Sequence, residues 1–197
     1  PRLLIVGLAP AAHGGNRTGR IFTGDRSGDW LFASLHRLGI AALPTSDYAG
    51  DGQRLLGARM VAAVRCAPPD NKPTVIERDT CQDWLRAEVA EVAGSVRAVA
   101  ALGSFGWQAA LRVLGQLGYR IPAPRPVFGH GAAVELLTEG SARGSGPGPD
   151  RRLLLVGLAI FGGAAALGLV VSDPGQLIAV RMLMGIGAAA IMPTTLS

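Results

Sequence analysis

Residues 3–38 read LLIVGLAPAAHGGNRTGRIFTGDRSGDWLFASLHRL, and this stretch sets the expectation for the whole fold. It opens with an aliphatic run, residues 3–6, that is typical of a short buried strand. The run ends at Gly7, and a long loop rich in glycine and arginine follows. Ser27 is then expected to cap a helix, because apolar residues recur at helical spacing behind it. A parallel strand that leads into such a loop and helix typically places a ligand site at its carboxyl end.

Length, charge and cysteine count narrow the class of protein. The chain has 197 residues, which predicts one domain or one domain and a fragment. Its formal net charge of +5 favours an acidic partner such as nucleic acid or an anionic membrane, although a merely basic soluble protein fits equally well. Two cysteines are too few for a disulfide framework, and the amino end does not resemble a signal peptide.

A change in composition divides the chain. Residues 1–139 read as a soluble α/β domain, and residues 140–150 form a linker rich in glycine, proline and serine. Within the first part, short apolar runs alternate with helical patterns, which predicts a parallel sheet covered on both faces. The expected strands after the first are residues 60–65 and 96–102, and the expected helices are residues 74–92 and 105–117.

The helix that begins at Thr74 is expected to bury one apolar face. Its first turn carries Glu77, and the residues assigned to the buried face are Trp84, Leu85, Val89 and Val92. The proline-rich segment before it, residues 66–73, is expected to be a loop because proline interrupts both helices and central strands.

Residues 151–197 are predicted to form an apolar hairpin of two transmembrane-like helices. Residues 153–171 carry no polar side chain and are long enough to cross a hydrocarbon core of about 30 Å. In the second apolar span, residues 176–196, Arg181 is the only charge. The many glycine and alanine residues suit close packing in lipid, and a buried hairpin in a soluble domain is the alternative.

The loop after the first strand carries side chains that suit a phosphate or base ligand. It lacks both a Walker sequence and a G-x-G-x-x-G motif, but its backbone amides and arginines are suited to binding phosphate. Asp25, at the end of the loop, either orients a water molecule or stabilises the start of the helix. Cys66 and Cys81 are either two metal ligands or two unrelated buried thiols, since an iron–sulfur cluster takes four cysteines.

Three stretches of the chain together resemble a known family. They are GLAPAAHGGNRTGRIFTGDRSGDWLF at 7–32, RCAPPDNKPTVIERDTCQDWL at 65–85 and ALGSFGWQAALRVLGQLGYRIPAPRPVFGHG at 101–131. Over residues 1–136 the chain resembles the type 5 uracil-DNA glycosylases, which are prokaryotic iron–sulfur members of the uracil-DNA glycosylase superfamily. The resemblance implies a three-layer α/β/α fold with a four-stranded parallel sheet. It leaves open whether the last of these strands is present.

The resemblance also implies a DNA repair reaction in the cytoplasm. Such an enzyme flips uracil or another deaminated base out of duplex DNA, because the glycosidic carbon is out of reach inside the base stack, and then hydrolyses the N-glycosidic bond. The matching positions assign Asp25 to water activation and Asn71 to the base edge or the backbone. They assign Cys66 and Cys81 to two of the four ligands of a 4Fe–4S cluster. Base-pocket and DNA-binding roles fall on Gly7, Ala11, His13, Asn16, Arg17, Arg20 and Phe22.

The chain departs from the family pattern in two places, and both predict an impaired activity. The family's first cysteine pair lies upstream of the opening strand. Its second catalytic motif, a His-Pro-Ser loop on the final strand, should follow Gly131, but the linker follows instead. A DNA-binding module without catalysis is therefore a third possibility beside an enzyme and a membrane protein.

The tail has a resemblance of its own. Asp150, Arg151, Arg152 and the segment 181–189 resemble two motifs of the drug:proton antiporters of the major facilitator superfamily, in which an intramembrane arginine is often functional. This favours, as the rival hypothesis, a membrane transporter fragment that associates with the membrane through residues 153–196. The sequence does not indicate an oligomeric state.

Overall fold

A central sheet of six strands organises the structure, in the order β2-β1-β3-β6-β5-β4. The computed structural model describes residues 1–138 and 152–158, which belong to one compact unit. β2, β1, β3 and β6 are parallel neighbours, and β5 runs antiparallel to both β6 and β4. The four expected parallel strands are therefore present, and two further strands extend them into a mixed sheet of six. The strands are β1 Leu3–Gly7, β2 Ala58–Ala62, β3 Ala98–Leu102, β4 Tyr119–Arg120, β5 Ala133–Thr138 and β6 Arg152–Leu158.

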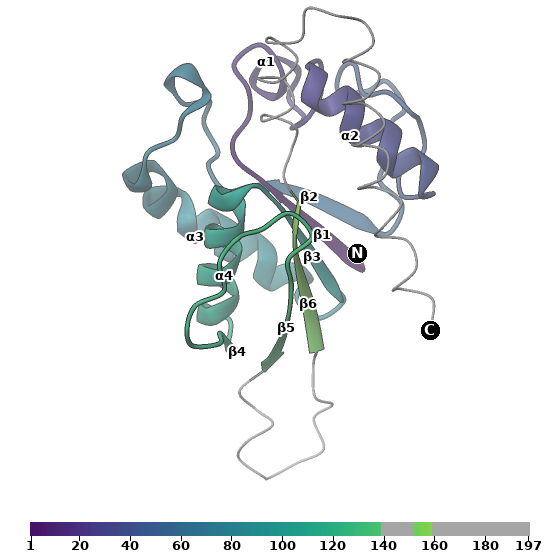
Figure 1. Ribbon diagram of the computed structural model, residues 1–197. Helices are drawn as coiled ribbons and strands as arrows, with labels where there is room; N and C mark the ends of the chain where they lie inside the picture. Colours follow the sequence, from purple (N-terminus) through teal and green to yellow (C-terminus); the bar gives the residue numbers. More distant parts are fainter. Residues whose placement is uncertain (139–151, 159–197) are drawn as a thin grey trace, which may run out of the picture. The chain divides into compact units, whose positions relative to one another are not determined.

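Helices cover both faces of this sheet, which confirms the three-layer α/β/α arrangement. Figure 1 shows α3 and α4 together on one side of the strands and α2 on the other. The main core fills the space beneath α3 and α4, and Phe32 and Leu35 of α2 are buried on the opposite side. The helices are α1 Gly15–Thr18, α2 Arg26–Arg37, the short 3₁₀ helix η1 Pro69–Asn71, α3 Val75–Val92 and α4 Ser104–Gln116.

The start of α2 differs from the expectation. Asp25, and not Ser27, is the N-cap residue, and its carboxylate accepts a hydrogen bond of 3.0 Å from the backbone N–H of Gly28. The Ser27 hydroxyl also donates to this carboxylate. The helix therefore begins two residues earlier than expected. An aspartate in an extended conformation accepts hydrogen bonds from the free N–H groups of the first helical turn as well as a serine does.

The start of α3 agrees with the expectation, but one residue of its predicted buried face does not. Thr74 caps the helix, and Thr74 and Glu77 form a reciprocal capping box. Leu85, Val89 and Val92 are buried as predicted, whereas Trp84 is 69% exposed. Trp84 precedes Leu85 by one position, which rotates its side chain about 100° away from the buried stripe.

Residues 152–158 form a strand, so the prediction that a transmembrane-like helix begins at residue 151 is wrong for this segment. β6 lies between β3 and β5, and Leu153 and Leu155 are at most 2% exposed. Gly157 is tightly covered, since a Cβ there would lie 2.7 Å from the carbonyl oxygen of Gly129. Because a strand that is covered on both faces is apolar throughout, its composition imitates the start of a membrane helix.

The rest of the predicted tail lies outside the described residues. This includes the linker at residues 140–150, Arg181 and all of the apolar hairpin beyond residue 158. Within the part of the chain that the structure does describe, no helix has both the length and the apolar character needed to cross a membrane.

Candidate functional site

The loop after β1 folds back over the carboxyl end of its own strand. Gly7 ends β1, and the carbonyl oxygen of Gly7 accepts a hydrogen bond of 3.0 Å from the N–H of Ala63. The ring of Phe22 lies directly against Gly7, because a Cβ at Gly7 would be only 2.7 Å from Phe22 Cε2. The structure thus brings together two residues that are far apart in the loop, a glycine that permits close approach and the edge of an aromatic ring.

Phe22 has an unusual backbone conformation. Its φ is 54°, in the left-handed region that residues other than glycine rarely adopt. Its carbonyl oxygen lies so close to Gly28 that a Cβ there would be 2.1 Å away. Strain of this kind persists only where the surroundings hold it, and such positions are common in binding sites.

Asp25 joins the loop to α2. Its Oδ1 atom accepts the capping hydrogen bonds, and its Oδ2 atom lies against Gly14, where a Cβ would be 2.2 Å away. The half-buried carboxylate therefore lies between the start of the helix and the first half of the loop. Its position fits either helix capping or a contact with a ligand in the loop.

The polar residues of the first half of the loop are mostly exposed. His13, Asn16 and Arg17 are exposed, and Ala11 is half-buried. Arg17 Nε donates a hydrogen bond of 2.9 Å to the carbonyl oxygen of His13, which orients its guanidinium at the loop surface. The carbonyl oxygen of Ala11 accepts from the N–H groups of Gly14 and Asn16, so this part of the loop is a hydrogen-bonded turn.

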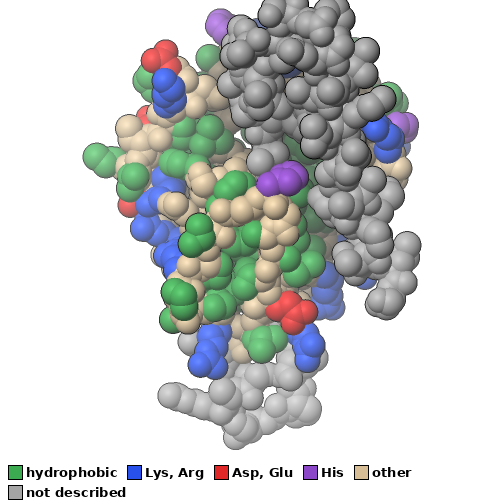
Figure 2. Space-filling view, in the orientation of Figure 1, with side chains coloured by type: hydrophobic (Ala, Val, Ile, Leu, Met, Phe, Trp, Pro, Cys, Tyr) green, Lys and Arg blue, Asp and Glu red, His purple; other side chains and the backbone are tan. Residues whose placement is uncertain are grey.

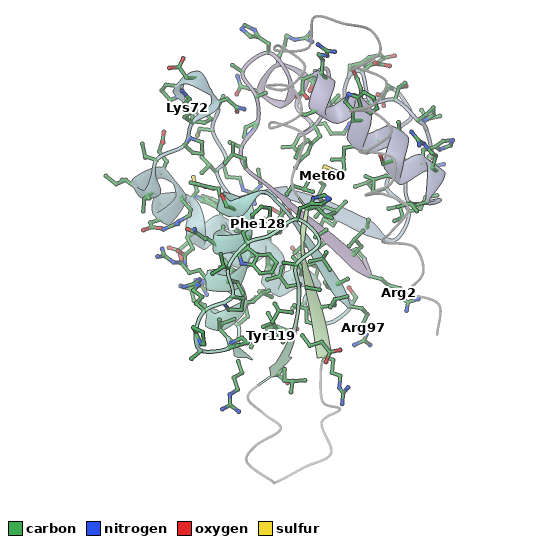
Figure 3. The ribbon with its side chains drawn as sticks, viewed as in Figure 1. Arg2, Met60, Lys72, Arg97, Tyr119 and Phe128 are labelled. Atoms are coloured by element: carbon green, nitrogen blue, oxygen red, sulfur yellow. The ribbon has the colours of Figure 1, made fainter. Side chains whose placement is uncertain are left out.

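A hollow lies between this loop and β2. Met60, which is labelled in Figure 3, is among its lining residues. Asn16 and Arg20 are among its lining residues, but Phe22, Asp25 and Asn71 are not. The described side chains therefore bring the predicted residues to one edge of the sheet without gathering them into one pocket. The hollow is lined by Pro10, Gly15, Asn16, Gly19, Arg20, Ile21, Met60, Val61, Ala62, Val64 and Arg65.

Thr18 is a loop residue that the sequence did not single out. Its hydroxyl lies 3.1–3.3 Å from the carbonyl oxygens of Gly14, Arg20 and Thr23. A threonine at the end of the short α1 helix thus connects both halves of the loop. The only sequence signal for it is a hydroxyl residue placed between two glycines.

Arg20, expected to bind phosphate, is bonded inside the protein. Its Nε donates to the Thr23 hydroxyl at 3.0 Å, and its Nη2 lies 2.9 Å from the Ser46 hydroxyl and 2.9 Å from the carbonyl oxygen of Tyr48. The same Nη2 forms a salt bridge of 2.6 Å with Asp51. The side chain is 25% exposed, so its charge is largely engaged by this network.

Asp51 is the acidic centre of that network. Beside Arg20, it accepts hydrogen bonds from the backbone N–H groups of Asp47 at 2.8 Å and Gln53 at 2.9 Å. The Arg20 guanidinium first, and these N–H groups after it, hold the pKa of Asp51 well below its usual range, against the opposite effect of burial. Asp51 therefore stays ionised in the folded protein.

Asn71 lies on a different loop, between β2 and α3. It is exposed, and both Asp70 and Asn71 have positive φ, at 52° and 56°. The N–H of Asn71 donates to the carbonyl oxygen of Pro68 at 3.1 Å. The neighbouring Lys72 stands at the tip of this loop, away from the body of the domain (Figure 3).

The two cysteines flank the loop that carries Asn71. Cys66 is exposed just after β2, Cys81 is half-buried on α3, and neither forms a disulfide. Among the described residues, no group of three or more His, Cys, Asp or Glu side chains is arranged to hold a metal ion. Because a 4Fe–4S cluster takes four cysteines, the described part offers half of such a ligand set.

Comparison with known proteins identifies the family. The model of the uracil-DNA glycosylase superfamily matches residues 1–171. The chain belongs to this superfamily. The match to the superfamily model extends through β6 and beyond it. It therefore includes residues that composition alone assigned to a membrane helix. The comparisons do not support a resemblance of the tail to drug:proton antiporters.

Within the uracil-DNA glycosylase superfamily, the chain is similar to proteins of one type. A type-5 uracil-DNA glycosylase of Mycobacterium bovis is 58% identical over 136 residues, which are 69% of this chain and 49% of the relative. The type-5 enzyme of Mycobacterium leprae is 56% identical, over 69% of this chain and 58% of the relative. That of Pyrobaculum aerophilum is 47% identical, over 68% of this chain and 55% of the relative. The chain thus spans about half the length of the curated relatives it matches.

Proposed function

We propose that this protein flips uracil or another deaminated base out of DNA and hydrolyses its N-glycosidic bond. The observation that carries the proposal is the loop over β1, in which the ring of Phe22 lies against Gly7. Type-5 uracil-DNA glycosylases are 47–58% identical to this chain over matches of 133 to 136 residues. A base must leave the stack before its glycosidic carbon can be attacked, and an aromatic face offers the flipped base a replacement for stacking.

Each loop side chain then has a distinct role. Phe22 stacks on the flipped base. Asp25 polarises the attacking water, and its ionised form stabilises the positive charge that develops on the sugar as the bond breaks. Arg17 binds a phosphate, because its guanidinium is held at the surface by the carbonyl oxygen of His13.

The loop that carries Asn71 completes the site from the β2 side. Asn71 hydrogen-bonds the base edge or the DNA backbone. Its exposure leaves the oxygen and the NH₂ group of its side-chain amide free to turn toward the DNA. A contact of this kind depends on the position of a loop that has two successive residues at positive φ. The loop therefore requires support from both of its ends.

A 4Fe–4S cluster would provide that support, with Cys66 and Cys81 as two of its four ligands. The proposal is supported by two free thiols, one at the start of this loop and one on the helix that follows it. A bound cluster would be structural, connecting the loop to α3. Iron and sulfide analysis of the purified chain tests it, with Cys66→Ser as the comparison. The proposal would be contradicted if the purified chain held less than one cluster per several chains and Cys66→Ser had the same iron and sulfide content.

A second candidate function is DNA binding without base release. The observation in its favour is that the chain has three histidines, His13, His36 and His130, and none stands in a His-Pro-Ser triplet. If that motif is required for bond cleavage, as the family resemblance implies, the DNA is bound and the base is not released.

One experiment separates these two functions. A duplex with a single uracil is incubated with excess full-length chain, and abasic sites are revealed by alkaline cleavage. A slow but uracil-dependent release of base, absent from the matching thymine duplex, supports the glycosylase. Salt-dependent binding of both duplexes without any release supports the binding module.

A further inference from the structure

A polar network connects the loop over β1 to a second loop that has no assigned role. The second loop comprises residues 42–53, which follow α2. The Thr23 and Ser46 hydroxyls are fully buried and lie 2.7 Å apart. The N–H of Gly24 donates a hydrogen bond of 3.0 Å to the carbonyl oxygen of Ser46. These contacts attach the two residues between Phe22 and Asp25 to the second loop.

Arg20 and Asp51 hold this junction together. Arg20 reaches the Thr23 hydroxyl on its own loop and Ser46, Tyr48 and Asp51 on the other, all within 3.0 Å. Asp51 in turn fixes the second loop through the backbone N–H groups that it accepts from. A guanidinium has several donors in one plane, and this network uses donors on two of its nitrogens.

We propose that Arg20 and Asp51 are a pair of positioning residues that set Phe22 and Asp25 for base flipping and bond cleavage, and that Arg20 does not bind DNA phosphate. The inference rests on the proposed glycosylase function. It deepens that function, because it assigns the second loop the task of holding the strained backbone at Phe22. Thr23 and Gly24 lie between the two functional residues, so a shift of the junction displaces both of them.

The alternative is that Arg20 binds phosphate and that Asp51 merely neutralises it in the free protein. The two roles predict opposite signs for Asp51→Asn. Removal of a carboxylate next to a phosphate-binding arginine strengthens DNA binding. Removal of a carboxylate that positions a loop lowers the cleavage rate and leaves the salt dependence of binding unchanged.

The test uses the full chain and the variants Arg20→Gln, Arg20→Lys, Asp51→Asn and Arg20→Gln/Asp51→Asn. Single-turnover release of uracil at saturating enzyme is measured alongside DNA affinity over a range of salt concentrations. Each single variant is expected to slow release about 10- to 100-fold, since small displacements of reacting groups have effects of this size. The double variant is expected to be no slower than the slower single variant, because both substitutions break the same junction.

Arg20→Lys separates a positioning role from phosphate binding. Lysine binds phosphate as a point charge but cannot replace the planar donors of arginine, so a phosphate role retains most activity and a positioning role does not. Glu88→Gln is the matched control, because Glu88 on α3 pairs with Arg59 of β2 and with Arg65 just after β2, and not with Arg20 or Asp51. It is expected to leave the release rate unchanged.

Hydrogen exchange gives a result that does not depend on activity. The amide of Gly24 and peptides from residues 43–53 are expected to exchange at least tenfold faster in Asp51→Asn than in the wild type, and not in Glu88→Gln. If the wild type releases no uracil, the proposed function fails and this measurement still decides the role of the pair. Unchanged exchange, or a salt slope that falls by about one in Arg20→Gln with tighter binding in Asp51→Asn, would overturn the proposal.

Discussion

Asp25 combines two roles that one well-chosen substitution can separate. Its carboxylate caps α2 through the N–H of Gly28, and we propose that it also polarises water. Asparagine caps a helix about as well as aspartate. We therefore expect Asp25→Asn to change the free energy of unfolding by less than about 0.5 kcal/mol. The same variant should lose about 10²- to 10⁴-fold of the uracil release rate, the usual contribution of a general acid or base.

Alanine at the same position provides the comparison. Asp25→Ala removes both roles and should cost about 1 kcal/mol of stability in urea unfolding in addition to the loss of activity. Thr74→Ala removes the equivalent cap from α3 and should have a similar cost in stability. A fully active Asp25→Asn would assign Asp25 to capping alone.

The depressed pKa of Asp51 predicts a stability that depends on pH in one direction. Because the folded-state pKa lies below the unfolded value of about 3.9, the Asp51 carboxylate stabilises the fold fully above that value. This contribution is lost as the pH falls through the folded-state pKa. We expect the difference in unfolding free energy between the wild type and Asp51→Asn to shrink when urea titrations are moved from about pH 6 to about pH 3.

Asp83→Asn is the control for this titration. The side chain of Asp83 is 87% exposed and lies 3.6 Å from Arg86 in a loose pair on α3. Its substitution should change stability little at any pH, as is usual for exposed ion pairs. A pH-independent difference for Asp51→Asn would mean that the substitution acts through packing and not through charge.

The contacts of the loop residues were harder to predict from the sequence than the loop itself. Asp25 and Ser27 are both good N-cap residues, and the choice between them depended on the fold of the preceding loop against Asp25. Arg20 looked like a phosphate ligand because its partners Ser46 and Asp51 are 26 and 31 residues away along the chain. No local pattern records a contact over that separation.

At the scale of whole elements, the identity of β6 can be tested with one pair of leucines. Leu155 is fully buried on β6, and Leu137 on the neighbouring β5 is 44% exposed. Leu155→Ala should reduce the free energy of unfolding by about 2–5 kcal/mol, and Leu137→Ala by less than about 1 kcal/mol. Urea unfolding of the full chain measures both. Near-equal effects would indicate that residues 152–158 do not occupy the centre of the sheet.

β6 also shows why the sequence failed at one central strand and succeeded at its neighbours β1 and β3. β1 and β3 were recognised because they are short apolar runs that end at glycines, within a chain of mixed polarity. β6 begins a long apolar stretch, and apolar content alone does not separate a central strand from a membrane helix. Its alternating burial, with Leu153 and Leu155 inward, is a property of the assembled sheet.

For the whole molecule, net charge alone says little about where DNA binds. Lys and Arg side chains are spread over the left flank and the lower rim of the surface shown in Figure 2, and do not form one patch. Arg2 and Arg97 lie side by side at the amino ends of β1 and β3 (Figure 3), at the opposite edge of the sheet from the loop over β1. A strand of five residues separates these edges by about 15 Å.

Two arginines that carry the same charge at opposite edges of the sheet can therefore be used to test where the DNA binds. Arg17 and Arg97 are both exposed. If DNA lies over the carboxyl ends of the strands, Arg17→Gln weakens binding and reduces the slope of log affinity against log salt by about one, because one phosphate contact and its counterion release are lost. Arg97→Gln then leaves this slope unchanged. Fluorescence anisotropy with a uracil duplex at several salt concentrations measures both slopes, and a reduced slope in Arg97→Gln alone would place the DNA at the amino edge instead.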